Sequence, residues 1–307
     1  MDRWLRRGVL TVADLPSVES FARGNGRLSA LVDRFVAGET LDDAVRAATG
    51  IAAQGMATTL DQLGEDERSV AGAAAANATY QTMLARLADA GLEPNISVKL
   101  TMLGLDLGAD VAEANLVSVL EAARQVSGFV RVDMESSAHT AATIDLVERA
   151  HERFPDEVGT VIQAYLHRSP EDARRLADRG MRLRLVKGAY SEPPAVALQQ
   201  RGEIDAAFAR IMEHLLDHAT YPAIATHDPA LVRATETYAV RVGRGRDDFE
   251  FQMLYGVRRA AQRALADDGW RMRVYVPFGT EWYPYFTRRV AERPANAWFV
   301  LRQLVSD

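Results

Sequence analysis

The chain has 307 residues, of which 48% are hydrophobic, and a formal net charge of -6 at pH 7. This size and apolar content allow a large buried core, either as one big α/β domain or as two ordinary ones, and argue against disorder. Dispersed arginines in an acidic chain argue against nucleic acid as a partner, and the absence of cysteine excludes disulfides, thiolate metal sites and a thiol nucleophile.

The first 50 residues are expected to form leading helices. Leu28, Leu31, Val32 and Phe35 recur at helical spacing, and a second helical pattern runs from residue 41 to 48 after Gly38. No apolar run approaches the roughly 18 residues that a bilayer span needs. We therefore expect a cytoplasmic protein, or one that is peripheral at the inner face of the membrane.

From about residue 55, short β-type runs alternate with longer helical segments rich in Ala and Arg, which predicts βα units around a parallel sheet. The spacing between runs leaves room for one strand, one helix and two loops each, so a (β/α)8 TIM-like barrel is predicted. A doubly wound sheet is the competitor, but it would normally carry a Gly-rich loop after its first strand, and none is found there. The eight runs are Ala57–Leu60, Ile96–Leu100, Phe129–Met134, Val161–Leu166, Leu183–Val186, Ala223–Thr226, Phe249–Leu254 and Arg273–Val276.

The two lysines are the most unusual feature of the composition. Of 36 basic residues, 34 are arginine, and Lys99 and Lys187 each lie at the end of a predicted buried strand. An ammonium is compact and sits on a flexible stem, whereas a guanidinium is wide and rigid. The pattern indicates two places that need a compact cation. The alternative is that codon bias favours arginine throughout and that the two lysines remain by chance.

Polar side chains collect at the carboxyl ends of nearly all predicted strands, where the active site of a barrel forms. Unpaired charges there would be costly, so they must neutralise one another or face a polar ligand. Setting the cations Lys99, Arg184, Lys187, Arg288 and Arg289 against the anions Glu65, Asp133, Glu135 and Glu292 predicts a slightly positive mouth and an anionic ligand. No metal site is predicted, because His214 and His218 have helical spacing but lack a third ligand.

Between about residues 55 and 295, a series of short motifs resembles the motifs of one known family and occurs in the same order. They are Asp61-Gln62-Leu63-Gly64-Glu65, Ser97-Val98-Lys99-Leu100, Val132-Asp133-Met134-Glu135, Gln163-Ala164-Tyr165-Leu166, Arg184 through Tyr190, Ala225-Thr226-His227, Leu254-Tyr255-Gly256, Tyr275-Val276-Pro277, and Tyr285 through Arg288, Arg289 and Glu292. Together they resemble the flavin-dependent proline dehydrogenases of the monofunctional bacterial type.

The resemblance implies a distorted (β/α)8 barrel with short N-terminal helices and noncovalent FAD at its mouth. It implies oxidation of L-proline to Δ1-pyrroline-5-carboxylate by hydride transfer from proline C5 to flavin N5, as the first step of proline catabolism to glutamate, with electrons passed to a membrane quinone. Residues 1–307 would form a single catalytic domain: leading helices to residue 50, the barrel over 55–295 and a tail over 296–307. With no cysteine for a fused aldehyde dehydrogenase, a separate pyrroline-5-carboxylate dehydrogenase would take the product.

Residue roles follow from the same resemblance. Lys99, Arg288 and Arg289 would hold the proline carboxylate; Tyr190, Leu254, Tyr275 and Tyr285 would wall the ring; Glu65 would pair with Arg288 as a gate; and Asp133 and Arg184 would be catalytic. Met134, Gln163, Arg184, Val186, Lys187, Gly188, Ala189, Thr226 and His227 would contact FAD, with Arg184 near flavin N5. Tyrosine at 275 would exclude a ring hydroxyl, because relatives that use hydroxyproline carry a smaller residue there.

Two other functions fit parts of the pattern. A barrel aldolase could use Lys99 or Lys187 as a Schiff base, since a desolvated strand-end lysine suits that chemistry. A flavin-free barrel that only binds amino acids would use the same cations for recognition. The sequence indicates no general base for the proline amine, so solvent is expected to take that proton.

Overall fold

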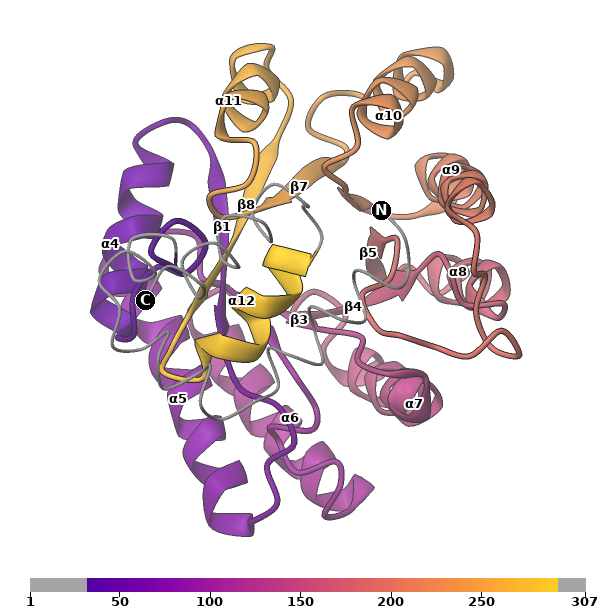
Figure 1. Cartoon of the computed structure of the whole chain (residues 1–307). Coiled ribbons are helices and arrows are strands. Elements are labelled where there is room, and N and C mark those ends of the chain that lie inside the picture. Colours follow the sequence, from indigo (N-terminus) through magenta and orange to yellow (C-terminus); the bar gives the residue numbers. More distant parts are fainter. Residues whose placement is uncertain (1–31, 292–307) are drawn as a thin grey trace, which may run out of the picture.

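The computed structural model describes residues 32–291, in which eight parallel strands close into a barrel with helices packed around it (Figure 1). Each strand pairs with its successor, and β8 pairs with β1 over six residue pairs to close the ring. The predicted (β/α)8 architecture is therefore confirmed. The strands are β1 (Ala57–Gln62), β2 (Asn95–Val98), β3 (Phe129–Val132), β4 (Val158–Gln163), β5 (Arg182–Val186), β6 (Ala223–Ala225), β7 (Glu250–Leu254) and β8 (Met272–Phe278).

The helices begin where the sequence offers side-chain caps. Thr40 and Asp43 form a capping box at the start of α4, the Ser69 hydroxyl accepts from the Gly72 N–H at α5, and Asp228 caps α10 ahead of a proline at its first position. The described helices are α4 (Leu41–Ala52), α5 (Val70–Asp89), α6 (Ala109–Gln125), α7 (Ser137–Arg153), α8 (Ser169–Asp178), α9 (Arg201–His218), α10 (Pro229–Val242), α11 (Arg259–Asp267) and α12 (Trp282–Ala291). None of these is both long and apolar enough to cross a membrane.

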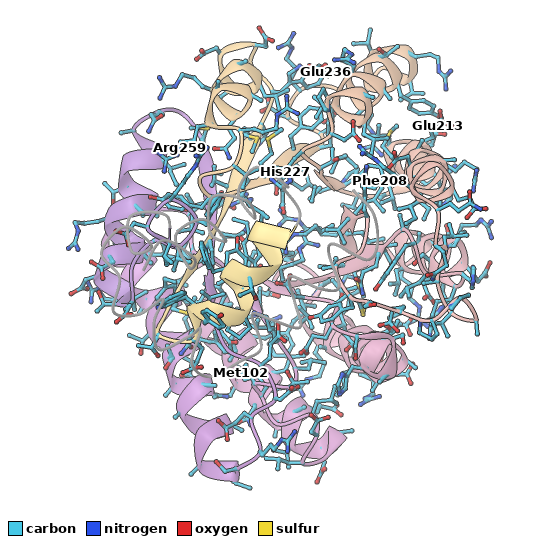
Figure 2. The ribbon with its side chains drawn as sticks, in the orientation of Figure 1. Met102, Phe208, Glu213, His227, Glu236 and Arg259 are labelled. Atoms are coloured by element: carbon cyan, nitrogen blue, oxygen red, sulfur yellow. The ribbon has the colours of Figure 1, made fainter. Side chains whose placement is uncertain are left out.

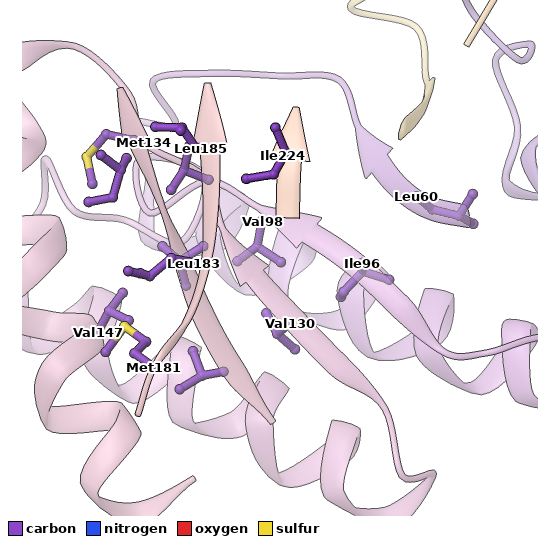
Figure 3. Packing of buried hydrophobic residues seen from close by; sticks show 14 of the residues in the cluster. Leu60, Ile96, Val98, Val130, Met134, Val147, Met181, Leu183, Leu185 and Ile224 are labelled. Carbon is purple, nitrogen blue, oxygen red and sulfur yellow. The ribbon is translucent and has the colours of Figure 1, made fainter. Parts of the chain in front are cut away.

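The main core lies between the barrel and the surrounding helices. Leu60, Ile96, Val98, Leu183 and Leu185 on the strands are fully buried in it (Figure 3). Because successive strand residues point to opposite faces, their neighbours in sequence point into the barrel, and many of these are polar. Barrel interiors are usually filled with branched apolar side chains, so a polar interior indicates chemistry inside this one.

Helix α12 departs from the regular ring of outer helices. Its aromatic residues Trp282, Tyr283, Tyr285 and Phe286 pack with residues of the loops after β1 and β7, as well as with Val32, Phe35 and Val36. In Figure 1 the helix crosses the barrel opening, and Pro284 and Tyr285 line the cavity there. This helix therefore covers the carboxyl end of the barrel.

The fourth predicted strand was placed three residues too late. Strand β4 begins at Val158 and contains Gly159, where a Cβ would lie 2.2 Å from the Arg182 carbonyl oxygen and 2.8 Å from Arg131 Nη1. Glycine is needed here because another side chain passes so close to the strand. Tyr165 and Leu166 lie beyond the strand, in a small second cluster with Ala197.

The expected leading helices are confirmed only from residue 41. Helix α4 buries Ala44, Ala48 and Ile51, as the spacing predicts. Val32 and Phe35 lie in a single turn, in which the Val32 carbonyl accepts from the N–H groups of Phe35 and Val36. Residues 1–31, including Leu28 and Leu31, and the predicted tail at 296–307 lie outside the described residues.

Candidate active site

A cavity of about 1230 Å³ opens at the carboxyl end of the barrel. Two of its lining residues, Met102 and His227, are labelled in Figure 2. Ser97, Tyr165 and Tyr255, which belong to the family motifs, are not part of the lining. The predicted site residues that line the cavity are Glu65, Lys99, Asp133, Met134, Gln163, Arg184, Val186, Lys187, Gly188, Ala189, Tyr190, Thr226, His227, Leu254, Tyr275 and Tyr285.

Arg288 and Arg289 lie on the last turns of α12, as the sequence predicts. Their side chains lie outside the described part of the chain, and so does Glu292. The expected pairing of Glu65 with Arg288 therefore stays a prediction.

Lys99 forms a buried ion pair with Asp61. The Nζ atom lies 2.7 Å from Asp61 Oδ1, and both side chains are almost fully shielded from solvent. Burial acts to lower the pKa of Lys99, but the adjacent Asp61 carboxylate outweighs it and the pKa is raised above its usual range. The amine is therefore held as a cation, which suits anion binding and disfavours a Schiff-base role.

Arg184 and Tyr275 meet at the carboxylate of Asp133. Arg184 Nη1 donates to Asp133 Oδ1 at 2.6 Å, and the Tyr275 hydroxyl donates to Oδ2 at 2.8 Å. Nη2 of the same arginine donates to Ser97 Oγ at 3.1 Å. Burial, together with the Asp133 charge, raises the pKa of Tyr275 well above its usual value, so the phenol stays a neutral donor. One carboxylate thus orients a cation and a ring that both line the cavity.

Lys187 is held by two carboxylates from different elements. Its Nζ forms ion pairs with Asp205 on α9 and with Asp228, the latter at 3.0 Å. Although burial opposes it, the hydrogen bond from Lys187 helps to hold the pKa of Asp228 below its usual value. The second lysine is therefore held in place by two ion pairs, whereas the first has one acidic partner.

A chain of hydrogen bonds connects the loops after β1, β2 and β3 with the last residue of β4. The Asp66 N–H donates to Thr101 Oγ1 at 3.3 Å, and Thr101 Oγ1 donates to Glu135 Oε2 at 2.5 Å. The Gln163 side chain then donates to the Glu135 carbonyl at 2.8 Å. Burial raises the pKa of Glu135, although the hydrogen bonds from Thr101 act to lower it. This chain fixes one wall of the cavity.

The loop after β5 approaches its neighbour so closely that it needs a glycine. Gly188 has φ +124°, and a Cβ there would lie 2.3 Å from the Tyr165 ring. The next N–H, of Ala189, donates to Gln163 Oε1 at 3.4 Å. After the adjacent strand β6, His227 Nε2 accepts from the Leu254 N–H at 2.9 Å, so its proton lies on Nδ1. Backbone groups thus shape this side of the cavity.

The expected slightly positive mouth is wrong for the described lining. Nine carboxylates and five lysine or arginine side chains line the cavity, and Lys99, Arg184 and Lys187 each have an acidic partner. Asp61, Asp205 and Asp228 were not among the anions expected to balance the charge. A ligand therefore meets charges of both signs, and carboxylates outnumber cations in the described lining.

Comparison with known proteins identifies the family. The family model described as "Proline dehydrogenase" matches residues 44–302. The chain belongs to the proline dehydrogenase family. Among its relatives, Proline dehydrogenase 1 of Bacillus subtilis is 39% identical over 302 residues, which cover 98% of this chain and 99% of the relative. Proline dehydrogenase of Deinococcus radiodurans is 37% identical over 309 residues, with 99% of each chain covered. These matches make the protein an oxidoreductase that acts on proline.

Longer relatives contain a similar region. Bifunctional protein PutA of Escherichia coli is 28% identical over an alignment of 320 residues, gaps included, that covers 88% of this chain and 24% of the relative. A crystal structure of proline utilization A from Bdellovibrio bacteriovorus, inactivated by N-propargylglycine, matches 91% of this chain and 34% of that chain with a TM-score of 0.81 and 26% identity. The family resemblance expected from the motifs is thus confirmed, and the aldolase and binding-only alternatives are set aside.

Proposed function

We propose that the protein oxidises L-proline to Δ1-pyrroline-5-carboxylate with noncovalent FAD, as the first step of proline catabolism to glutamate. The observation that carries this proposal is the paired charge at the cavity wall: Lys99 with Asp61, and Arg184 with Asp133. Proline is a zwitterion with a small apolar ring. Paired cations and carboxylates beside aromatic walls complement such a molecule, whereas a single-sign cavity would not.

The cavity also fits a bound flavin nucleotide. Its volume of about 1230 Å³ is larger than a site for proline alone would need. Gly188 leaves the backbone open where a side chain would collide with Tyr165. In the described part of the chain, the buried Nε of Arg184 has no hydrogen-bond partner and is available to an acceptor on a ligand. We propose that FAD is held by Met134, Gln163, Arg184, Val186, Lys187, Gly188, Ala189, Thr226 and His227.

When bound, FAD would supply the two-electron acceptor for the hydride of proline C5. The chain's own residues bind and orient the substrate. Lys99, together with Arg288 and Arg289, holds the proline carboxylate, and Glu65 closes the site by pairing with Arg288. Tyr190, Leu254, Tyr275 and Tyr285 hold the ring at a fixed angle, and a fixed orientation of the reacting atoms lowers the barrier of such a transfer.

The amine proton of proline is proposed to leave to solvent. Lys99 and Arg184 are cations bound to carboxylates and cannot accept it. The electrons are proposed to continue to a membrane quinone, and the product to a separate pyrroline-5-carboxylate dehydrogenase. We further propose that residues 1–307 act as one catalytic domain, in the cytoplasm or at the inner face of the membrane.

An anaerobic visible spectrum tests the proposal. The purified protein, reconstituted with FAD, should show flavin bands that bleach with millimolar L-proline and persist with D-proline. Bands that persist with L-proline would indicate a flavoprotein with another substrate. A protein that stays colourless after reconstitution would overturn the cofactor assignment.

Tyr275→Ser should allow turnover of 4-hydroxyproline. The Tyr275 ring borders the cavity, and Arg184 Cζ lies 5.2 Å from the centroid of this ring. Serine at this position would leave room for a hydroxyl on the substrate ring. Asp133 keeps its partner Arg184 in this variant. Steady-state kinetics should show the ratio of kcat/KM for hydroxyproline over proline rising by about tenfold or more, since excluding a hydroxyl by shape has that magnitude. Tyr275→Phe is the control, and an equal gain there would assign the effect to the lost hydroxyl and its hydrogen bond to Asp133, not to the space left by the ring.

A further inference from the structure

The connection from β5 to α9, residues 187–200, carries Tyr190 to the cavity. The second half of this Tyr190 loop is tied to the segment after β4. The Leu198 N–H donates to the Tyr165 carbonyl at 2.8 Å, and the His167 N–H donates to the Val196 carbonyl at 3.0 Å. Tyr190 itself lies six residues before Val196, and the stretch between them contains two prolines. On its other side, the N–H of the neighbouring Ala189 makes a long hydrogen bond of 3.4 Å to Gln163 Oε1. The position of Tyr190 therefore depends on further contacts within this stretch.

Glu192 provides a contact to a different element. The N–H of Ser137, the first residue of α7, donates to Glu192 Oε1 at 2.7 Å, and the Ser137 hydroxyl donates to Glu192 Oε2. The preceding Ser136 makes no side-chain cap, because its hydroxyl is bonded to the His139 ring at 3.2 Å. Glu192 thus satisfies an N–H at the start of α7 from 55 residues away along the chain.

The physical basis of this contact is favourable. A carboxylate at a helix N-terminus is stabilised by the N–H groups and by the helix dipole, and two hydrogen bonds to a charged group are stronger than neutral ones. The backbone of Glu192 is held as well, because Gln199 Nε2 donates to its carbonyl at 3.2 Å. Glu192 is half-buried and is not part of the cavity lining. Any effect on the substrate must therefore act through the loop.

We propose that Glu192 is a positioning residue for proline binding: by bonding to Ser137 it holds the Tyr190 loop against α7 and so keeps Tyr190 at the cavity wall. This inference rests on the proposed function, which assigns Tyr190 to the proline pocket. The carboxylate acts on substrate affinity and not on the chemical step, because it touches neither ligand site.

Two variants break the contact from opposite sides. Glu192→Ala removes the acceptor. Ser137→Pro removes the N–H and the hydroxyl, and proline is well accepted at the first position of a helix; Ser136, at φ -61° and ψ 163°, already has the backbone that precedes proline. Each variant should raise the KM for proline by about tenfold with kcat changed less than about twofold, the pattern of lost uniform binding. FAD content should stay unchanged.

The double variant should be no worse than either single one, since both remove the same contact. Glu203→Ala, at an exposed glutamate in the first turn of α9, is the matched control and should leave KM unchanged. Cleavage by chymotrypsin after Tyr190 should be faster in the two contact variants than in this control. Faster cleavage with an unchanged KM would overturn the proposal.

A Tyr190→Ala background separates this inference from the proposed function. Tyr190→Ala should raise KM by itself, and adding Glu192→Ala should then have no further effect. If Tyr190→Ala raises KM and Glu192→Ala does not, the positioning role is wrong and the pocket assignment stands. If Tyr190→Ala leaves KM unchanged, the assignment of Tyr190 to the pocket is wrong, and the role of Glu192 falls with it.

Discussion

Arg184→Met should slow flavin reduction by proline by about 10²- to 10³-fold, the usual cost of removing one preorganised charged donor. Methionine is about as long as the arginine stem up to Nε, but it lacks the cation and the hydrogen bonds to Asp133 and Ser97. A cation beside the cofactor is proposed to stabilise the negative charge gained there during hydride transfer. Anaerobic stopped-flow absorbance measures this step directly. Affinity for a proline analogue that cannot be oxidised should change by less than about threefold. The reason is that Lys99, Arg288 and Arg289, which are proposed to hold the substrate carboxylate, are unchanged in this variant.

A second variant identifies the source of this loss. Arg184→Met leaves Asp133 without its ion pair, although the Tyr275 hydroxyl still donates to it. In the double variant Arg184→Met with Asp133→Asn, the stranded charge is removed as well. A reduction rate that stays low in the double variant supports a direct role for the cation. A rate that recovers would assign the defect to the unpaired carboxylate and contradict the proposed role of Arg184.

The sequence was informative about the site because barrel strands end at a common edge. Eight predicted strands in a barrel place the polar residues that follow them around one opening. The two lysines at strand ends, Lys99 and Lys187, indicated that cations lie there. Hydrophobic patterning alone predicts the carboxyl end of a strand. Only β4 was misplaced, because Gly159 interrupts the pattern of β-type residues at the start of this strand. The family motifs then added the residue roles, which stay predictions.

The charge partners could not be read from the sequence. Asp61 pairs with Lys99 across adjacent strands, and Asp205 reaches Lys187 from a helix surface. Which carboxylate meets which cation depends on strand register and helix rotation, and neither follows from spacing along the chain. The same applies to Glu192, an acidic residue in a proline-containing loop, whose partner Ser137 is set by the packing of the loop against α7.

A second charged cluster, distinct from the cavity, lies at the opposite end of the barrel. Arg273, 2% exposed, donates from Nε to Glu250 Oε1 at 2.8 Å and from Nη2 to Glu93 Oε1 at 2.9 Å. Arg131 lies in the same interior and donates only to backbone carbonyls of Thr160 and Arg182 in the described chain. Burial, together with the Arg184 and Arg182 charges, holds the pKa of Arg131 well below its usual value. Glu250 is therefore the central anion among several buried arginines.

Glu250→Gln should be among the most destabilising single substitutions in the chain. Although burial opposes it, the Arg273 guanidinium holds the pKa of Glu250 at about 2. Removing one member of a buried pair costs about 3–5 kcal/mol, because the remaining charge stays buried. In a protein of this size we expect a fall in Tm on the order of 10 °C, measured by calorimetry with FAD present. Glu113→Gln is the matched control, since Glu113 binds Arg149 through the same kind of contact but on the surface, and it should cost less than about 1 kcal/mol.

The pH dependence of the same pair gives an independent check. The pKa of Glu250 is lower in the folded than in the unfolded protein, so its stabilising effect is complete above the unfolded value of about 4.5 and is lost as the pH falls toward 2. The shift corresponds to about 3 kcal/mol, at about 1.4 kcal/mol for each pH unit. The difference in urea midpoint between the wild type and Glu250→Gln should therefore be constant from pH 8 to about 6 and shrink below about pH 5. A difference that is independent of pH over this range would show that Glu250 is not held as a carboxylate by Arg273.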